Sequence, residues 1–125
     1  PALAAPGAED FDGIQEELRR TVPESHLAFL RGLKTWHIEG GYLFVHAGIR
    51  PGIPIEQQTR HDLTFSREGF VDCDEDHGYV VVHGHTVHAT PEFLPNRINI
   101  DTGAFESGTL TCLILEGESQ AILQT

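Results

Sequence analysis

The chain has 125 residues, of which 39% are hydrophobic, so it is long enough for one domain with a core and is not compositionally disordered. Its 19 acidic residues against 8 Lys and Arg give a formal charge of -11, which argues against a nucleic acid or an anionic membrane as partner. No run approaches the ~18 apolar residues of a membrane span, and residues 1–8 lack the basic start and apolar core of a signal peptide.

The first part of the chain predicts two helices after a short leading segment. Residues 1–8 are small and rich in Pro and Gly, which is typical of a linker or a frayed end. Residues 9–20 carry apolar side chains at helical spacing. A second helix is predicted from Thr21, which has the form of the N-cap of a capping box closed by Glu24. That helix is expected to end near residues 32–34, where its basic side chains suit the negative end of the helix dipole.

The pattern changes to short strands at Trp36. Trp36–Glu39 and Tyr42–Val45 are predicted as two strands that Gly40 and Gly41 join into a hairpin. Pro and Gly then break the chain into an irregular loop, and Asp62–Phe70 is expected to hold short helical turns.

The second half of the chain predicts further strands. Val80–Val82 is wholly apolar, the pattern of a strand that is covered on both faces. Ile98–Ile100 and Leu110–Leu115 are expected strands, and residues 121–124 are expected to pair with the latter across a Gly-containing turn. Helices followed mainly by strands indicate an α+β domain without internal repeats.

The cysteines indicate a reducing compartment. Cys73 and Cys112 form no CxxC pair and no dense framework, which favours free or buried thiols over a disulfide. We therefore expect a cytoplasmic protein.

Two histidine motifs stand where predicted strands end. His46 lies in Val-His-Ala-Gly and His85 in His-Gly-His-Thr, each beside a small residue that leaves room for a ligand. Ligand-binding groups gather at the carboxyl ends of strands in α/β folds, so these two side chains are candidate metal ligands. Structural histidines remain the alternative on spacing alone. His83 and His88 are interpreted as supporting or surface residues.

Asp101 and Arg67 are two further candidates. Asp101 follows a predicted strand, and we interpret it as an Asx-type turn that shapes the loop before Gly103. Arg67 lies among apolar residues in an acidic chain, and its guanidinium suits bidentate phosphate binding. A surface ion pair with Glu68 is the alternative for Arg67.

Taken together, these motifs resemble the C-terminal half of bacterial serine/threonine phosphatases of the phosphoprotein phosphatase family, which are calcineurin-like metallophosphoesterases. The resemblance is carried by Val-His-Ala-Gly at 45–48, Gly-His-Thr at 84–86 and Ile-Asp-Thr-Gly-Ala at 100–104, in family order. It implies that residues 9–125 form the C-terminal part of a metallophosphoesterase β-sandwich flanked by helices, with the N-terminal half absent.

The resemblance also implies a chemistry. Members hold two divalent ions, which are Mn, Fe or Zn, and a metal-bridging hydroxide attacks phosphorus. His46 and His85 match two metal ligands, and Arg67 matches an arginine that grips the substrate phosphate. The family's Trp-Ile before that arginine is replaced here by Phe65 and Ser66. The implied substrate is a phosphorylated protein or a small phosphomonoester.

The family's N-terminal motifs, Gly-Asp-x-His-Gly, Gly-Asp-x-x-Asp-Arg-Gly and Gly-Asn-His-Glu, do not occur in this sequence. They supply the remaining metal ligands, including the bridging carboxylate. We therefore expect this chain to be part of a larger enzyme, to bind metal weakly and partially, and to be inactive alone. An incomplete sandwich is also expected to expose apolar surface and to self-associate.

Two other functions fit the same residues. A diadenosine tetraphosphatase-like nucleotidase of the same superfamily would share the chemistry and differ in substrate. A non-catalytic domain that keeps the scaffold and binds a partner is the alternative from outside the enzymes.

Overall fold

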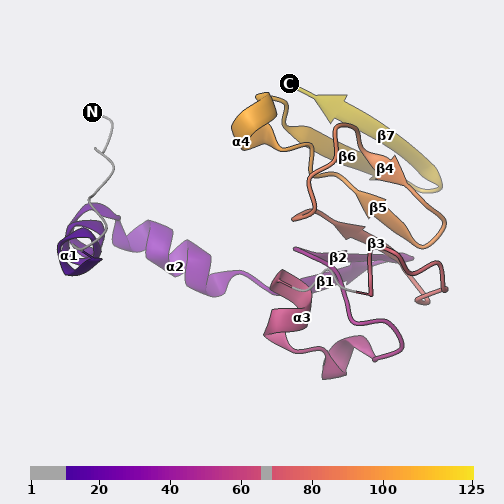
Figure 1. Ribbon diagram of the computed structural model, residues 1–125, viewed down its shortest axis with the longest axis horizontal. Coiled ribbons are helices and arrows are strands. Elements are labelled where there is room, and N and C mark those ends of the chain that lie inside the picture. The colour runs from indigo at the N-terminus through magenta and orange to yellow at the C-terminus, as the bar shows by residue number, and fades with distance from the viewer. Residues whose placement is uncertain (1–10, 66–68) are drawn as a thin grey trace. The chain divides into compact units, whose positions relative to one another are not determined.

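The computed structural model describes residues 11–65 and 69–125, which fall into two units, one ending at Lys34 and the other running from Thr35 to Thr125. The first unit holds two helices, α1 (Phe11–Thr21) and α2 (Glu24–Gly32), as the sequence predicts (Figure 1). Neither helix buries a residue. No helix in the described part of the chain has the length and apolar character needed to cross a membrane.

The predicted capping box at Thr21 is wrong. Thr21 is the last residue of α1, and the amide of Val22 still donates to the carbonyl of Leu18 (2.9 Å). Pro23 is the N-cap of α2, and no side chain caps that helix. Because α1 continues through Thr21, its hydroxyl does not precede a set of free amides, which an N-cap requires.

The second unit is built on a five-stranded sheet with the order β1-β2-β3-β5-β4 (Figure 1). Its strands are β1 (Trp36–Glu39), β2 (Tyr42–Val45), β3 (Val80–His83), β4 (Glu92–Phe93) and β5 (Arg97–Asn99). The three central strands β2, β3 and β5 are parallel, and the two edge strands run antiparallel to their neighbours. The carboxyl ends of β2, β3 and β5 therefore meet at one edge of the sheet.

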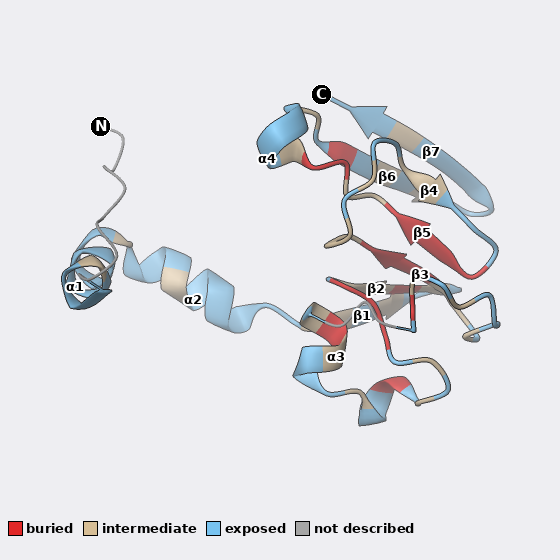
Figure 2. Cartoon of the chain, viewed as in Figure 1, coloured by how far each residue is buried: buried red, intermediate tan, exposed pale blue. Residues whose placement is uncertain are grey.

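The core lies on one face of this sheet. Leu43 of β2 and Val81 of β3 are paired across the parallel ladder and point to that face. The segment between β2 and β3 covers them with buried Ile49, Ile55, Leu63 and Phe70. This segment contains the 3-10 turn η1 (Ile55–Gln57) and the short helix α3 (Arg60–Thr64), and Figure 2 shows buried positions in both.

A true capping box occurs at α3. The Thr59 hydroxyl accepts from the Asp62 amide (3.2 Å), and the Asp62 carboxylate accepts from the Thr59 amide (2.8 Å). That second hydrogen bond holds the pKa of Asp62 below its ordinary value. The reciprocal bonds satisfy two amides that a five-residue helix could not satisfy by itself.

A separate hairpin completes the unit. The strands β6 (Thr111–Glu116) and β7 (Ser119–Gln124) pair antiparallel in a two-stranded sheet, which confirms the predicted pairing. The short helix α4 (Ala104–Ser107) precedes them. The Thr102 hydroxyl bonds to that of Thr111 (2.8 Å) and ties β6 to the loop that follows β5. Helices and mixed sheets together give the expected α+β fold.

Candidate functional site

The parallel strands bring His46, His85 and Asp101 to the same edge of the sheet. His46 directly follows β2, His85 lies two residues beyond β3, and Asp101 lies two residues beyond β5. The ladder continues past the strand ends, because the Gly84 amide donates to the His46 carbonyl (2.9 Å) and the Ile100 amide to the His83 carbonyl (3.0 Å). The backbone positions of these loops are thus set by the sheet itself.

The rings of His46 and His85 are neighbours. Their centroids lie 5.2 Å apart with an interplanar angle of 61°. Two imidazoles that share a tetrahedral ion, with metal–nitrogen bonds of about 2.0–2.1 Å, place their ring centroids about 5 Å apart. His46 is exposed and His85 is half-buried, so the pair is open to solvent. Their spacing and ligand chemistry fit one shared divalent ion.

The two histidines line a hollow of about 330 Å³. That volume is at the lower end of the range for small-molecule sites. Its walls come from the carboxyl ends of β2 and β3, the loop after β5 and the start of β6. They consist of Phe44, Val45, His46, Val82, His83, Gly84, His85, Ile100, Asp101, Leu110 and Thr111.

Asp101 is held by backbone amides. Its Oδ2 accepts from the His85 amide (2.8 Å) and its Oδ1 from the Gly103 amide (3.0 Å). The bond to Gly103 is the Asx turn predicted from the sequence, and that interpretation is confirmed. The bond to His85 was not predicted, because it joins two loops that only the parallel sheet brings together.

Phe65 places an aromatic ring beside His85. Their ring centroids lie 5.7 Å apart, and the Phe65 ring also stacks on His61 at 5.7 Å. Phe65 is 67% exposed, which is unusual for a phenylalanine that serves only the core. The only sequence signal for it was its departure from the family's pattern before Arg67. Arg67 itself lies outside the described residues, so its phosphate-binding role stays a prediction.

His83 is a buried structural residue. It is 2% exposed, and burial lowers its pKa to about 4, so the ring is neutral near pH 7. Its Nδ1 lies 3.1 Å from the Gly84 carbonyl and its Nε2 lies 3.4 Å from Nη1 of Arg97. Of the two roles expected for His83, supporting or surface, the surface role is therefore wrong, because β3 turns the ring towards Phe70 on the core face (centroids 5.0 Å apart).

Behind His83 lies a buried cation that the sequence did not reveal. Arg97 is 3% exposed, donates to Glu92 (2.6 Å) and to the Val71 carbonyl (3.0 Å), and leaves its Nε without a partner. The hydrogen bond from Arg97 is the main cause that lowers the pKa of Glu92. Glu92 also lies 3.6 Å from the partly exposed ring of His88, which gives His88 a supporting contact.

The described residues offer two metal donors at this site, the imidazoles of His46 and His85. Among residues 11–65 and 69–125, no group of three or more His, Cys, Asp or Glu is placed to hold a metal ion. Both oxygens of Asp101 already accept from amides. The described residues therefore fit one ion shared by two imidazoles, and they do not fit a complete two-ion centre.

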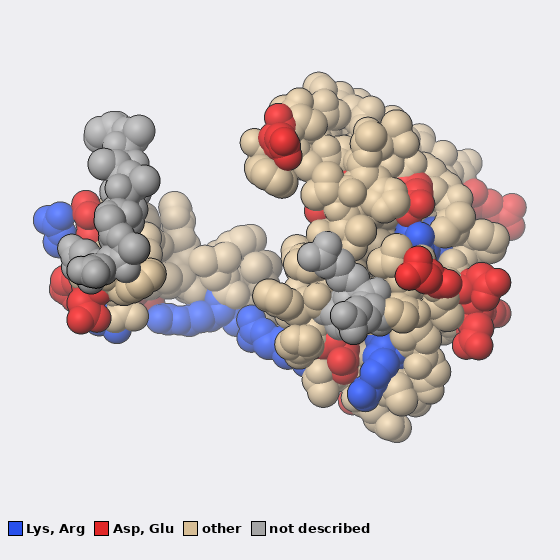
Figure 3. All heavy atoms as spheres, viewed as in Figure 1, with Lys and Arg blue, Asp and Glu red and all other residues tan. Residues whose placement is uncertain are grey.

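The surface of the sheet unit is acidic. On the face shown in Figure 3, acidic side chains outnumber basic ones in this unit. The loop before β3 alone carries four exposed carboxylates, on Asp72, Asp74, Glu75 and Asp76. The surface charge as a whole would not draw an anionic substrate to the histidine pair.

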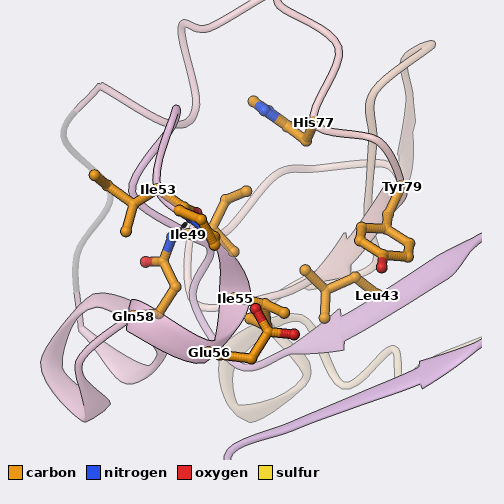
Figure 4. A pocket seen from close by; sticks show the side chains of 9 residues that line it. Leu43, Ile49, Ile53, Ile55, Glu56, Gln58, His77 and Tyr79 are labelled. Atoms are coloured by element: carbon orange, nitrogen blue, oxygen red, sulfur yellow. Dashed lines mark hydrogen bonds between the residues drawn. The ribbon is translucent and has the colours of Figure 1, made fainter.

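A second, smaller pocket of about 200 Å³ lies under the other face of β2, since Leu43 lines it and Phe44 lines the histidine hollow (Figure 4). The Gln58 amide beside it bonds both polar backbone groups of Arg50 and the Ile53 carbonyl. Its walls are about equally polar and apolar, and they consist of Leu43, Ile49, Ile53, Pro54, Ile55, Glu56, Gln58, His77 and Tyr79. It offers no cluster of reactive groups.

The α+β domain thus places two imidazoles at the carboxyl ends of adjacent parallel strands, at a spacing that suits one shared divalent ion. No protein-family model matches the chain. A segment of 48 residues is 42% identical to the symmetrical bis(5'-nucleosyl)-tetraphosphatase of Aromatoleum aromaticum, and it covers 38% of this chain and 18% of that protein. At most, this similarity supports a hydrolase of the metallophosphoesterase superfamily, whose members use divalent metal ions.

Proposed function

We propose that this chain supplies two histidine ligands, His46 and His85, to the metal centre of a phosphoesterase. The observation that carries the proposal is the 5.2 Å separation of the two rings at the carboxyl ends of β2 and β3. The partial similarity to a tetraphosphatase independently supports the same superfamily. A divalent ion held there would supply Lewis-acid activation of a phosphoryl oxygen.

The chain's own residues would bind and orient the substrate around that ion. Phe65, which lies against His85, gives an apolar wall that shields one side of the pair from water. We also assign phosphate binding to Arg67, because a guanidinium pairs with phosphate oxygens in a bidentate manner. The free thiols of Cys73 and Cys112 suit a reducing compartment, which supports a cytoplasmic setting for the reaction.

Two substrate classes are supported by different observations. The motifs around His46, His85 and Asp101 favour a serine or threonine phosphoprotein. The match to a symmetrical bis(5'-nucleosyl)-tetraphosphatase favours a dinucleoside polyphosphate. Rates on a phosphopeptide and on a dinucleoside tetraphosphate, measured with the full-length product of the gene, separate the two.

The 125-residue chain by itself is proposed to bind one ion weakly and to have no turnover, since only two imidazoles are available from the described residues. The test is the hydrolysis of an aryl phosphate with added Mn²⁺. Mn²⁺-dependent turnover that disappears in His46→Ala would contradict the second half of this statement. A titration in which neither His46→Ala nor His85→Ala weakens Mn²⁺ binding would contradict the first half.

In the full-length gene product, we expect His46→Ala and His85→Ala each to lower kcat/KM by at least about 100-fold, because a lost ligand disturbs the Lewis acid itself. His37→Ala is the matched control. His37 is an exposed histidine of β1 that lies 3.6 Å from the Glu39 carboxylate and stacks on Phe44, away from the His46–His85 pair. Its activity should stay within about twofold, and equal losses in all three variants would refute a metal role for the pair.

A further inference from the structure

His85 has a backbone conformation that needs support. In the described part of the chain it is the one residue other than glycine with a positive φ, at 66°. A side chain in this left-handed region costs about 1–2 kcal/mol. Strained residues of this kind persist only where the surroundings hold them in place. Something must therefore hold His85 in the geometry that brings its ring to His46.

Asp101 makes the contact that holds it. Its Oδ2 accepts from the His85 amide at 2.8 Å, and its Oδ1 accepts from the Gly103 amide at 3.0 Å. A carboxylate that accepts two backbone amides is a strong, directional acceptor, because its charge strengthens both bonds. The same side chain therefore fixes the loop after β3 against the loop after β5.

The neighbouring residues are arranged to keep Asp101 in this position. A Cβ on Gly84 would lie 3.3 Å from the Asp101 Cβ and 3.5 Å from its Oδ2, so glycine allows the carboxylate to approach. Asn99, which is 1% exposed, accepts from the Asp101 amide (3.0 Å) and donates to the Thr86 carbonyl (2.7 Å). Asn99 of β5 therefore fixes the backbone of Asp101 and that of Thr86, the residue after His85.

From this geometry we propose that Asp101 is a positioning residue for the metal site: it accepts from the His85 backbone and thereby holds the His85 imidazole beside that of His46. The inference rests on the proposed function, since the orientation matters because the two rings share an ion. Asp101 acts through the backbone of His85, since both of its carboxylate oxygens already accept from backbone amides.

The first experiment uses the metal-free chain. In wild type, nuclear Overhauser contacts are expected between the ring protons of His46 and His85. Asp101→Asn exchanges one acceptor oxygen for a donor, so one amide loses its partner, and the contacts should weaken or vanish. Asp76→Asn is the control, because Asp76 makes a similar turn bond to the Gly78 amide (2.8 Å) in another loop. Asp76→Asn should keep the ring contacts.

A second pair of variants tests the same idea without touching the carboxylate. Gly84→Ala places a methyl group against Asp101, whereas Gly41→Ala meets no atom within 4 Å. Gly84→Ala should lose the ring contacts and Gly41→Ala should retain them. Folded Asp101→Asn and Gly84→Ala proteins that both keep the wild-type ring contacts would overturn the positioning role.

The third measurement adds Co²⁺ and follows its absorption spectrum. If His46 and His85 bind the ion, His46→Ala should abolish the signal and Asp101→Asn should weaken binding by about 10–100-fold, as for other groups that orient ligands. Asp76→Asn should bind as wild type does. Binding of Co²⁺ that is insensitive to His46→Ala would refute the proposed function, while the metal-free ring contacts would still decide whether Asp101 positions His85.

Discussion

At the residue scale, the cluster of His83, Arg97 and Glu92 shows how a charge is held inside an acidic chain. The Gly84 carbonyl can only accept and the Arg97 guanidinium can only donate. His83 satisfies both when Nδ1 carries the proton and Nε2 accepts, at 3.1 and 3.4 Å. One neutral tautomer therefore fits both partners, which agrees with the lowering of its pKa to about 4 by burial.

This assignment gives a spectroscopic prediction. Nitrogen-15 shifts of His83 should report the neutral tautomer protonated at Nδ1, and they should stay constant from about pH 8 to about pH 5.5. An exposed histidine titrates near pH 6.5 and would change over that range. A His83 that titrates with an ordinary pKa, or that is protonated at Nε2, would contradict the buried geometry.

Glu92 is the residue that compensates the charge of Arg97. We expect Glu92→Gln to lower the free energy of unfolding by about 2 kcal/mol near neutral pH. This is less than the cost of breaking a fully buried pair, because Glu92 is partly exposed. Urea unfolding measures the change. Glu39→Gln, which removes an exposed partner of His37, is the control and should cost no more than about 0.5 kcal/mol.

The same variant has a defined pH dependence. The folded pKa of Glu92 lies below its ordinary value, so the native state favours the charged form. The stability that the Glu92 carboxylate contributes is fully present above its pKa in the unfolded chain, and it is lost as the pH falls through its pKa in the folded protein. The difference between wild type and Glu92→Gln should therefore be constant near neutral pH and shrink below about pH 4.5. A difference that grows on acidification would contradict this sign.

The sequence reveals some of these residues and hides others for physical reasons. His46 and His85 are found because each follows an apolar run that ends in a glycine-containing loop. Arg97 is not found, because a charged residue is normally exposed and its burial depends on Glu92 and Val71 being folded against it. For Asp101, the turn to Gly103 is predicted because it is local in sequence. Its hydrogen bond to the His85 amide is missed because it joins residues from two separate loops.

At the element scale, the loop after β2 depends on Gly48, because a core side chain fills the space where a side chain at this position would lie. A Cβ on Gly48 would lie 2.3 Å from Cδ1 and 2.7 Å from Cε1 of Phe70. Phe70 is fully buried and contacts the rings of His77 and His83. A buried ring can move aside only by disturbing the side chains packed around it, so glycine at position 48 allows Phe70 to lie against the loop that carries His46.

Gly48→Ala should therefore be strongly destabilising. The added methyl group overlaps a buried ring, and we expect a loss of at least about 3 kcal/mol in the free energy of unfolding. Gly52→Ala is the control, because Gly52 also has a positive φ (75°) but meets no atom within 4 Å. It should cost only the backbone strain of about 1–2 kcal/mol. Equal losses in thermal or urea unfolding would show that the Phe70 contact is not decisive.

Elements with strong local signals are predicted correctly. The hairpin of β1 and β2 is found because an alternating segment and an apolar segment flank a Gly-Gly turn. The strand β3 is found because three valines in a row suit a covered strand. The cap at Thr21 fails because α1 continues through Thr21, so the motif spans the break between α1 and α2 and Pro23 takes the N-cap position. The two-residue β4 is missed, since Glu92–Phe93 pairs with β5 through tertiary contacts and has too few residues to show a period.

At the scale of the whole molecule, the hairpin of β6 and β7 has an uncovered face. Alternation along the strands puts Leu110, Cys112 and Ile114 on one face of β6, and the register places Leu123 opposite Cys112. Leu110 and Leu123 are both 62% exposed and Ile114 is 46% exposed. Figure 2 shows β7 and α4 as mainly exposed. A two-stranded sheet is marginally stable by itself, and an exposed apolar face on it favours association.

We expect a second copy of the chain to cover this face. Within the described residues, β6 and β7 pair only with each other, so each has a free edge that can accept a strand from a like partner. Light scattering coupled to size exclusion should give a mass above that of one chain, rising with protein concentration.

Leu123→Lys puts a charge on the apolar face beside the free edge and should return the protein to a monomer. Phe29→Ser removes a similarly exposed aromatic residue (67%) from α2 and should leave the association intact. Association abolished by Phe29→Ser and not by Leu123→Lys would place the contact on the helices, and a monomer at every concentration would show that the hairpin tolerates its exposed face.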